Sequence, residues 1–328
     1  MNLTPPGSQF KECFDLLKVV KEEFKKGIVG QTEMIDSLLL AILASGHVLI
    51  EGVPGLAKTR AVNLLSQMCK TSFQRLQFTP DLLPADIVGT QIYNLNEGHF
   101  SIKKGPLFAH FILADEINRA PAKVQSALLE AMQEKRVTIA EETFDLPKPF
   151  FVFATQNPIE QEGTYPLPEA QVDRFLIKLV VTYPTVEEEK NIVKMVMNEV
   201  NLPKLDPHLD PDLILKLQAA SRDVFIEEKI IDYITSLVFA TRFPDQNGIA
   251  NLKDIIELGA SPRASISLAT VAKANALLLG RNTVIPEDIK AIALPVLRHR
   301  IIPTYQADAE GITSDQIVME ILRKVKVP

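Results

Sequence analysis

Short apolar runs alternate with amphipathic stretches along the first part of the chain, and this pattern predicts strands separated by helices. Each apolar run is bounded by glycine, proline or polar residues, as is usual for strands buried on both faces of a parallel sheet. The expected strands are His47–Glu51, Ser72–Phe78, His110–Asp115, Phe150–Thr155 and Phe175–Val181. The alternation predicts an α/β fold, with a five-stranded parallel sheet between two layers of helices.

Helical periodicity fills the remainder of the chain. A leading helix is expected over Phe10–Lys25, and after the fifth strand a helix over Val186–Val200 leads into the proline-containing connection Leu202–Pro211. Beyond that connection we expect only helices, over Leu213–Ser221, Glu227–Arg242, Ser261–Leu279, Pro286–Leu297 and Ile317–Val325. The sequence therefore predicts an α/β domain over residues 1–201 and an all-helical lid domain over residues 202–328.

Two further segments alternate apolar and polar residues between the expected strands. One covers about residues 90–105, with its turn at Glu97-Gly98, and the other covers about residues 135–147. Such alternation predicts two β-hairpins inserted into the sheet domain.

The first expected strand runs directly into a glycine-rich loop and then into a helix, which is the setting of a phosphate-binding P-loop. In such a loop Lys58 reaches the β- and γ-phosphate oxygens, and the Thr59 hydroxyl binds Mg²⁺. Ala57 stands where the usual pattern has glycine, and the loop remains plausible if φ there is negative. An ordinary Gly-Pro turn is the alternative. The residues expected around the phosphates are Gly52, Pro54, Gly55, Leu56, Ala57, Lys58, Thr59 and Arg60.

Polar residues follow two later strands at the sheet edge where ligands bind in α/β folds. Asp115 is placed to hold Mg²⁺, and Glu116 is placed to orient and deprotonate the attacking water. Asn157, after the fourth strand, is expected to hold that water against the γ-phosphate. The alternatives are a helix N-cap at Asp115-Glu116, before the helix expected over Ala122–Glu134, and a turn that starts at Asn157-Pro158.

Taken together, these motifs resemble the AAA+ ATPase superfamily, and the strings around them resemble its MoxR family over nearly the whole chain. The resemblance implies a three-layer αβα P-loop core with a helical lid. It also places the two hairpins among the insertions of the clade that contains MoxR, which face the pore or the surface of a ring. The segments that carry the resemblance are Gly52–Thr59, Asp81–Gly89, Ala114–Ala120, Ala154–Pro158, Leu167–Phe175, Ser261–Ala264 and Pro295–Arg300.

The resemblance also assigns residues outside the strand ends. Arg174 matches the arginine finger that reaches a neighbouring subunit's nucleotide, whereas its local chemistry also suits a helix-end arginine. Arg263 matches sensor 2, which contacts phosphate from the same chain's lid, and Arg119 is a second candidate for a contact between subunits. The segment that wraps the adenine includes Ile28, Val29 and Gly30, which could otherwise form a simple turn between helices.

The resemblance implies ATP hydrolysis in a ring of identical subunits, with a hexamer expected. It further implies chaperone-like remodelling, maturation or activation of a protein client, sometimes by metal-cofactor insertion, often with a von Willebrand factor A-domain partner. A magnesium-chelatase-like motor subunit remains an alternative. A nucleotide-gated module without catalysis would lack Lys58, Glu116, Asn157 or Arg174, and all four are present.

Composition bears on the partners and the compartment. A net charge of −6 disfavours a nucleic-acid motor, for which the basic pairs Lys103-Lys104 and Lys135-Arg136 on the two hairpins are the only support. Cys13 and Cys69 form no disulfide framework, so a reducing cytoplasm is expected. We expect no membrane insertion, because no apolar run is long enough to span a bilayer.

Overall fold

The computed structural model describes residues 6–28, 31–53, 55–95, 98–158, 163–197 and 206–328. Its central sheet has five parallel strands, and the five predicted strands are confirmed with ends that move by at most two residues. In the order in which they pair, the strands are β2 (Phe73–Gln77), β5 (Phe111–Asp115), β8 (Phe151–Gln156), β1 (Val48–Glu51) and β9 (Ile177–Val180).

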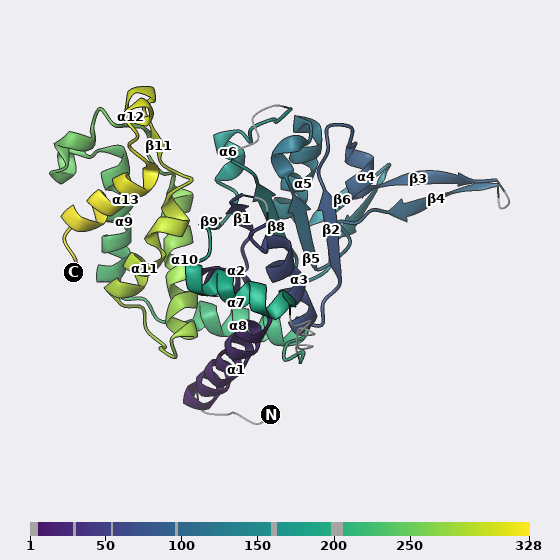
Figure 1. Cartoon of the computed structure of the whole chain (residues 1–328), viewed down its shortest axis with the longest axis horizontal. Coiled ribbons are helices and arrows are strands. Elements are labelled where there is room, and N and C mark those ends of the chain that lie inside the picture. The colour runs from purple at the N-terminus through teal and green to yellow at the C-terminus, as the bar shows by residue number, and fades with distance from the viewer. Residues whose placement is uncertain (1–5, 29–30, 54, 96–97, 159–162, 198–205) are drawn as a thin grey trace.

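Successive side chains of a strand point to opposite faces of the sheet. Apolar side chains of the inner strands therefore lie on both faces, and helices cover both. Val48 and Ile50 of β1 belong to one hydrophobic core, whereas Leu49 belongs to a second core beneath α5 (Ala122–Glu134). Within the sheet domain, the helices of the first core are α1 (Pro6–Gly27), α2 (Thr32–Leu43) and α3 (Lys58–Met68). The predicted three-layer α/β core is therefore confirmed (Figure 1).

Both predicted hairpins are present. The first, β3 (Gly89–Asn94) with β4 (His99–Lys104), follows α4 (Pro84–Val88) and projects from the body of the molecule as an arm (Figure 1). At its base, a Cβ on Gly89 would lie 2.5 Å from the Lys103 carbonyl oxygen, so only glycine fits there. Of the predicted turn, Gly98 has φ 67° and Glu97 lies outside the described residues. The second hairpin joins β6 (Arg136–Ile139) to β7 (Glu142–Asp145).

After β9, α7 (Val186–Met197) leaves the sheet and a helical lid follows, as predicted. The lid helices are α8 (Pro211–Asp223), α9 (Glu228–Arg242), α10 (Pro262–Leu278), α11 (Pro286–Leu297), α12 (Tyr305–Ala309) and α13 (Ser314–Lys324). The lid also contains an antiparallel ribbon of β10 (Ile256–Leu258) and β11 (Ile302–Pro303), which the all-helical prediction lacked. The predicted boundary between residues 201 and 202 lies outside the described residues and stays a prediction. Among the described helices, none combines the length and the apolar character needed to cross a bilayer.

The lid and the sheet domain share one hydrophobic core. α8 and α10 pack against α2, and α11 packs against the edge strand β9. Buried side chains from both parts, such as Leu38 and Leu268, belong to the same cluster. This packing fixes the start of α10 against the segment that leads into β9.

Candidate active site

The predicted phosphate-binding loop connects β1 to α3 at the carboxyl edge of the sheet and is described except for Pro54. Its backbone passes through the left-handed region at Gly55 (φ 87°) and at Ala57 (φ 57°). The Ala57 carbonyl accepts a hydrogen bond from the Ala61 N–H (2.9 Å), so α3 begins directly at the loop. The N-terminal N–H groups of an 11-residue helix thus lie beside the loop, where they suit an anion.

The condition of a negative φ at Ala57 is not met. Ala57 is the N-cap of α3 with φ 57° and ψ 17°, a conformation that costs alanine about 1–2 kcal/mol. Glycine, which adopts a positive φ freely, would relieve that cost. The adjacent Leu56 is buried.

Lys58, the first residue of α3, is half-buried and donates to the Gly52 carbonyl oxygen at the end of β1. Burial lowers the pKa of Lys58, while Asp115, Glu116 and Glu51 act in the opposite direction. The ammonium group therefore lies within the field of three carboxylates, where it would meet the phosphates of a bound nucleotide.

Asp115, the last residue of β5, is buried, and both of its carboxylate oxygens have partners. Oδ1 accepts from the Thr155 hydroxyl (2.6 Å), and Oδ2 accepts from Arg75 Nη2 (2.7 Å) and Nε (3.1 Å). The Thr59 hydroxyl lies 3.4 Å from the same Oδ2. A hydroxyl and a carboxylate oxygen so close together form a donor set that suits Mg²⁺, so Thr59 and Asp115 fit the predicted metal site.

Glu116 follows with φ 57°, and its carboxylate is also held. Oε2 accepts from Gln77 Nε2 (2.6 Å) and from Arg119 Nη1 (3.1 Å), and the backbone N–H of Glu116 donates to the Thr155 hydroxyl (2.9 Å). The Glu116 side chain does not cap the short 3₁₀ helix Ile117–Arg119 that follows. The helix-cap alternative therefore does not account for this acidic pair. Arg119 is engaged with the site of its own chain.

Sequence reasoning missed three residues that hold these carboxylates: Arg75, Gln77 and Thr155. Arg75 and Gln77 are two residues apart on β2, so their side chains point to the same face, and β2 pairs with β5 in a register that opposes Gln77 to Asp115. The polar alternation along Phe73–Gln77 was the only available signal. It could not be connected to the acidic pair before the strand register was known.

Asn157 directly follows β8 and is buried. The last residues of β8 and β1 pair as Gln156 and Glu51, and the Gly52 N–H donates to the Gln156 carbonyl oxygen (3.3 Å). Asn157 therefore leaves the sheet beside the phosphate loop, where it lines a cleft of about 550 Å³ that includes residues of the lid. This location agrees with the predicted role in holding water, which stays a prediction.

The expected adenine segment and Arg60 lie together. Ile28 is buried at the end of α1, whereas Val29 and Gly30 lie outside the described residues. Arg60 donates from Nε (3.2 Å) and Nη2 (2.9 Å) to the Gly27 carbonyl oxygen. Its guanidinium therefore ties α3 to the end of α1 and does not lie in the phosphate loop.

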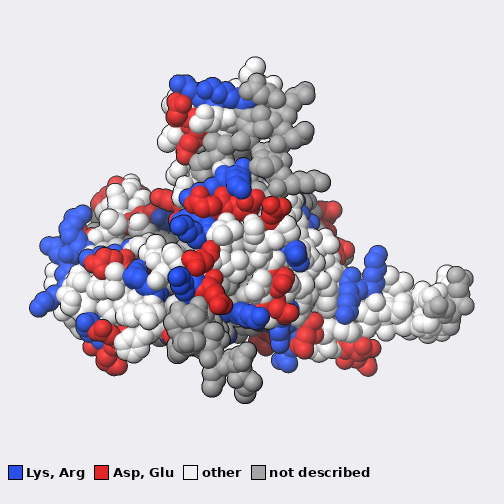
Figure 2. Space-filling view, turned by 90° about the horizontal axis from the view of Figure 1, so that it is seen from below, with Lys and Arg blue, Asp and Glu red and all other residues white. Residues whose placement is uncertain are grey.

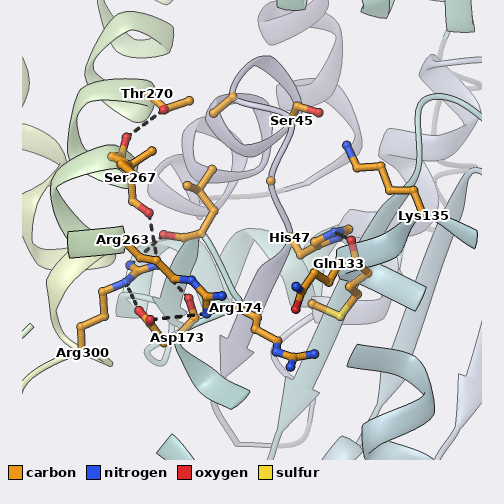
Figure 3. A pocket seen from close by; sticks show the side chains of 15 residues that line it. Ser45, His47, Gln133, Lys135, Asp173, Arg174, Arg263, Ser267, Thr270 and Arg300 are labelled. Carbon is orange, nitrogen blue, oxygen red and sulfur yellow. Dashed lines mark hydrogen bonds and ion pairs between the residues drawn. The ribbon is translucent and has the colours of Figure 1, made fainter. Parts of the chain in front are cut away.

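Arg174 and Arg263 lie at the other edge of the sheet. Both line a pocket of about 360 Å³ together with Ser45 and His47, which precede β1, whereas the phosphate loop follows β1 (Figure 3). Arg174 lies between α6 (Glu169–Val172) and β9, and its Nη1 donates to the Leu129 carbonyl oxygen of α5 (3.0 Å).

Arg263 therefore does not contact the phosphate site of its own chain, contrary to the expectation from the family resemblance. It occupies the first turn of α10, and the Ser261 hydroxyl caps this helix by accepting from the Arg263 N–H (3.2 Å). The cause lies in the packing of α10, which begins against the α6–β9 turn. There Arg263 Nη1 lies 3.8 Å from Asp173 Oδ2.

Comparisons with known proteins agree with this architecture. Residues 47–177 match the model of the ATPase family associated with various cellular activities (AAA), and residues 250–321 match the AAA lid domain. The chain is 48% identical to Chaperone MoxR1 of Mycobacterium tuberculosis, over 93% of this chain and 81% of that protein. It is 44% identical to the uncharacterized protein YeaC of Bacillus subtilis, over 97% of each. A crystal structure of a candidate ATPase from Cytophaga hutchinsonii has a TM-score of 0.92 at 51% identity, covering 98% of this chain and 97% of that chain.

The matched family spans the loop, both acidic residues and the segment of Arg174, and the matched lid model includes Arg263. The likeness to MoxR1 extends over most of both chains. This chain belongs to the MoxR family of AAA ATPases.

Proposed function

We propose that this ATPase hydrolyses Mg²⁺–ATP in a ring of its own copies, in which arginines of one subunit complete the active site of the next. The observation that carries this proposal is the separation of Arg174 and Arg263 from the phosphate loop by the full height of the sheet. Neither arginine can serve its own chain's nucleotide from there. In the proposed ring both would face a neighbour's nucleotide, where a guanidinium would neutralise charge on the γ-phosphate.

Within one subunit, each polar group at the carboxyl edge has a proposed task. Lys58 binds the β- and γ-phosphate oxygens, Glu116 takes a proton from the attacking water, and Asn157 orients that water. Mg²⁺ held by Thr59 and Asp115 would neutralise phosphate charge. Before Glu116 can reach the water, its carboxylate must leave the hydrogen bonds that it accepts from Gln77 and Arg119.

The output that we propose for the cycle is chaperone-like action on a protein client. The first support is the similarity to a protein named as a chaperone. The second is the β3–β4 arm, which carries large apolar side chains that are exposed on the single chain: Ile92, Tyr93, Leu95 and Phe100. Apolar groups on a projecting arm are suited to contact exposed apolar segments of another protein.

Finer parts of the proposal concern the ring and its surroundings. A hexamer, a von Willebrand factor A-domain partner, metal-cofactor insertion and a cytoplasmic location belong to the proposal through the family resemblance. Acidic and basic side chains are interspersed on the face seen in Figure 2, which is unlike the continuous basic surface of a nucleic-acid motor.

The direct test is the ATPase rate per subunit as a function of protein concentration, measured alongside the mass by light scattering with ATP and Mg²⁺. A shared active site predicts a specific rate that rises as the ring assembles. A rate that stays constant while the protein remains a monomer would mean that Arg174 and Arg263 have no site to complete.

A further inference from the structure

Asp173, the residue before Arg174, is held by side chains of the lid. Its Oδ1 accepts from Arg300 Nε (2.8 Å), and its Oδ2 accepts from the Ser261 hydroxyl (3.1 Å). Arg263 approaches the same Oδ2 at 3.8 Å. Figure 3 shows Arg300 and Arg263 converging on Asp173 from the lid, with Arg174 on the other side of the turn.

Arg300 also holds the backbone on both sides of Arg174. Its side chain is only 2% exposed. Nη2 donates to the carbonyl oxygens of Phe175 (2.7 Å) and Asp173 (3.3 Å), and Nη1 donates to that of Leu176 (3.2 Å). One guanidinium from the lid therefore binds three of the carbonyl groups that flank the arginine finger.

A buried arginine is costly unless it is paired and its donors are satisfied, and here both conditions hold. Burial lowers the pKa of Arg300, and the Asp173 carboxylate acts in the opposite direction. The planar guanidinium offers five N–H donors in a fixed fork, whereas a lysine ammonium is a compact point charge with three. Lysine could keep the charge opposite Asp173 but could not keep the set of backbone bonds.

We propose that Arg300 is a positioning residue for Arg174: through Asp173 and the flanking carbonyls, the lid fixes the turn from which the finger reaches the neighbouring subunit. This inference rests on the proposed function, because it assumes that Arg174 acts on a neighbour's nucleotide. In this proposal the lid acts on the side of the subunit that lies opposite the nucleotide-binding site of the same chain.

The experiment compares the variant Arg300→Lys with the matched control Arg281→Lys. Arg281 is also a lid arginine with two bonds to a carboxylate, but its partner Asp288 (2.6 and 2.5 Å) belongs to the lid. A displacement of about 1 Å at a catalytic group can cost about 100-fold in rate, so we expect Arg300→Lys to lower kcat by about 10- to 100-fold. ATP affinity and ring mass should stay unchanged, and Arg281→Lys should keep the wild-type kcat.

Two readouts separate positioning from a merely structural role. First, mixing Arg300→Lys with Glu116→Gln protein should restore activity, because the second protein supplies intact fingers to the intact sites of the first. Second, on an Arg174→Ala background, Arg300→Lys should lower kcat by less than about twofold, since the group that it positions is already gone. No recovery on mixing, or the full loss on that background, would overturn the inference.

If Arg300→Lys fails to fold, Asp173→Asn provides the same test with a smaller change, and the same two outcomes decide it. The proposed function is tested separately by Arg174→Ala. If that variant keeps the wild-type kcat, the trans-acting finger itself is wrong. If it loses activity while Arg300→Lys and Asp173→Asn do not, only the positioning role of Arg300 is wrong.

Discussion

Replacing Arg75 with glutamine tests how the metal site is held before Mg²⁺ arrives. Arg75 donates two hydrogen bonds to Asp115 Oδ2, the oxygen that also faces the Thr59 hydroxyl. A hydrogen bond to a charged group contributes about 1.5–3 kcal/mol, whereas an exposed ion pair contributes about 0–1 kcal/mol. The Arg75 side chain is 52% exposed, so solvent screens its interaction with Asp115, and we take the contribution of that interaction as about 1 kcal/mol.

Mg²⁺ bound at this oxygen would compete with Arg75, so the variant Arg75→Gln should favour the metal by that amount, which corresponds to about fivefold in affinity. Calorimetry would measure ADP binding with Mg²⁺ and with EDTA, and the ratio of the two affinities isolates the contribution of the metal. We expect this ratio to rise about fivefold in Arg75→Gln. The matched control is Arg323→Gln, which removes an exposed arginine paired with Glu320 in α13.

A ratio that is unchanged or lower in folded Arg75→Gln protein would refute the reasoning. It would mean that Arg75 and the metal do not share Oδ2, for example because Asp115 turns another oxygen toward the ion. A change of equal size in Arg323→Gln would attribute the effect to net charge alone.

The remaining predictions concern the base, the buried histidine and the arm. Glu116→Gln should bind ATP with unchanged affinity and hydrolyse it at least about 100-fold more slowly in single-turnover assays, and normal turnover would exclude Glu116 as the base. Burial lowers the pKa of His47 to about 4, so the unfolded state takes up a proton from about pH 6.5 downward while the folded state does not. The free energy of unfolding should therefore fall by about 3 kcal/mol between pH 6.5 and 4 from this group, and denaturant titrations of His47→Gln should show a shallower fall. Phe100→Ser should weaken binding of a permanently unfolded protein, measured by fluorescence anisotropy, without changing the ATPase rate; equal binding would remove the arm as the client contact.

The sheet and its loop could be predicted because their signals are local. Each buried strand is a short apolar run, and the phosphate loop, Asp115 and Glu116 follow strand ends in a fixed order. The ribbon of β10 and β11 was missed because its strands are three and two residues long and pair across a helical segment. The left-handed Ala57 was missed because alanine by itself favours a negative φ, so the sequence carries no signal for this conformation.

The positions of several site side chains could not be predicted from the sequence, because they depend on contacts between distant segments. The assignment of Arg263 required knowing how α10 packs against α2 and the turn before β9, which is a long-range contact. Arg75 and Gln77 needed the register between β2 and β5. These residues carry no motif of their own, so only the assembled fold brings them to the acidic pair.

The central claim is that each active site is shared between two subunits. The most direct measurement is the ATPase rate of mixtures of Arg174→Ala and Glu116→Gln proteins, each with little activity alone, across the full range of ratios. Completion of a site by a neighbour predicts that activity appears on mixing and peaks at an intermediate ratio, because some interfaces then pair an intact Glu116 with an intact Arg174. Absence of activity at every ratio, in rings shown to contain both proteins, would contradict the account.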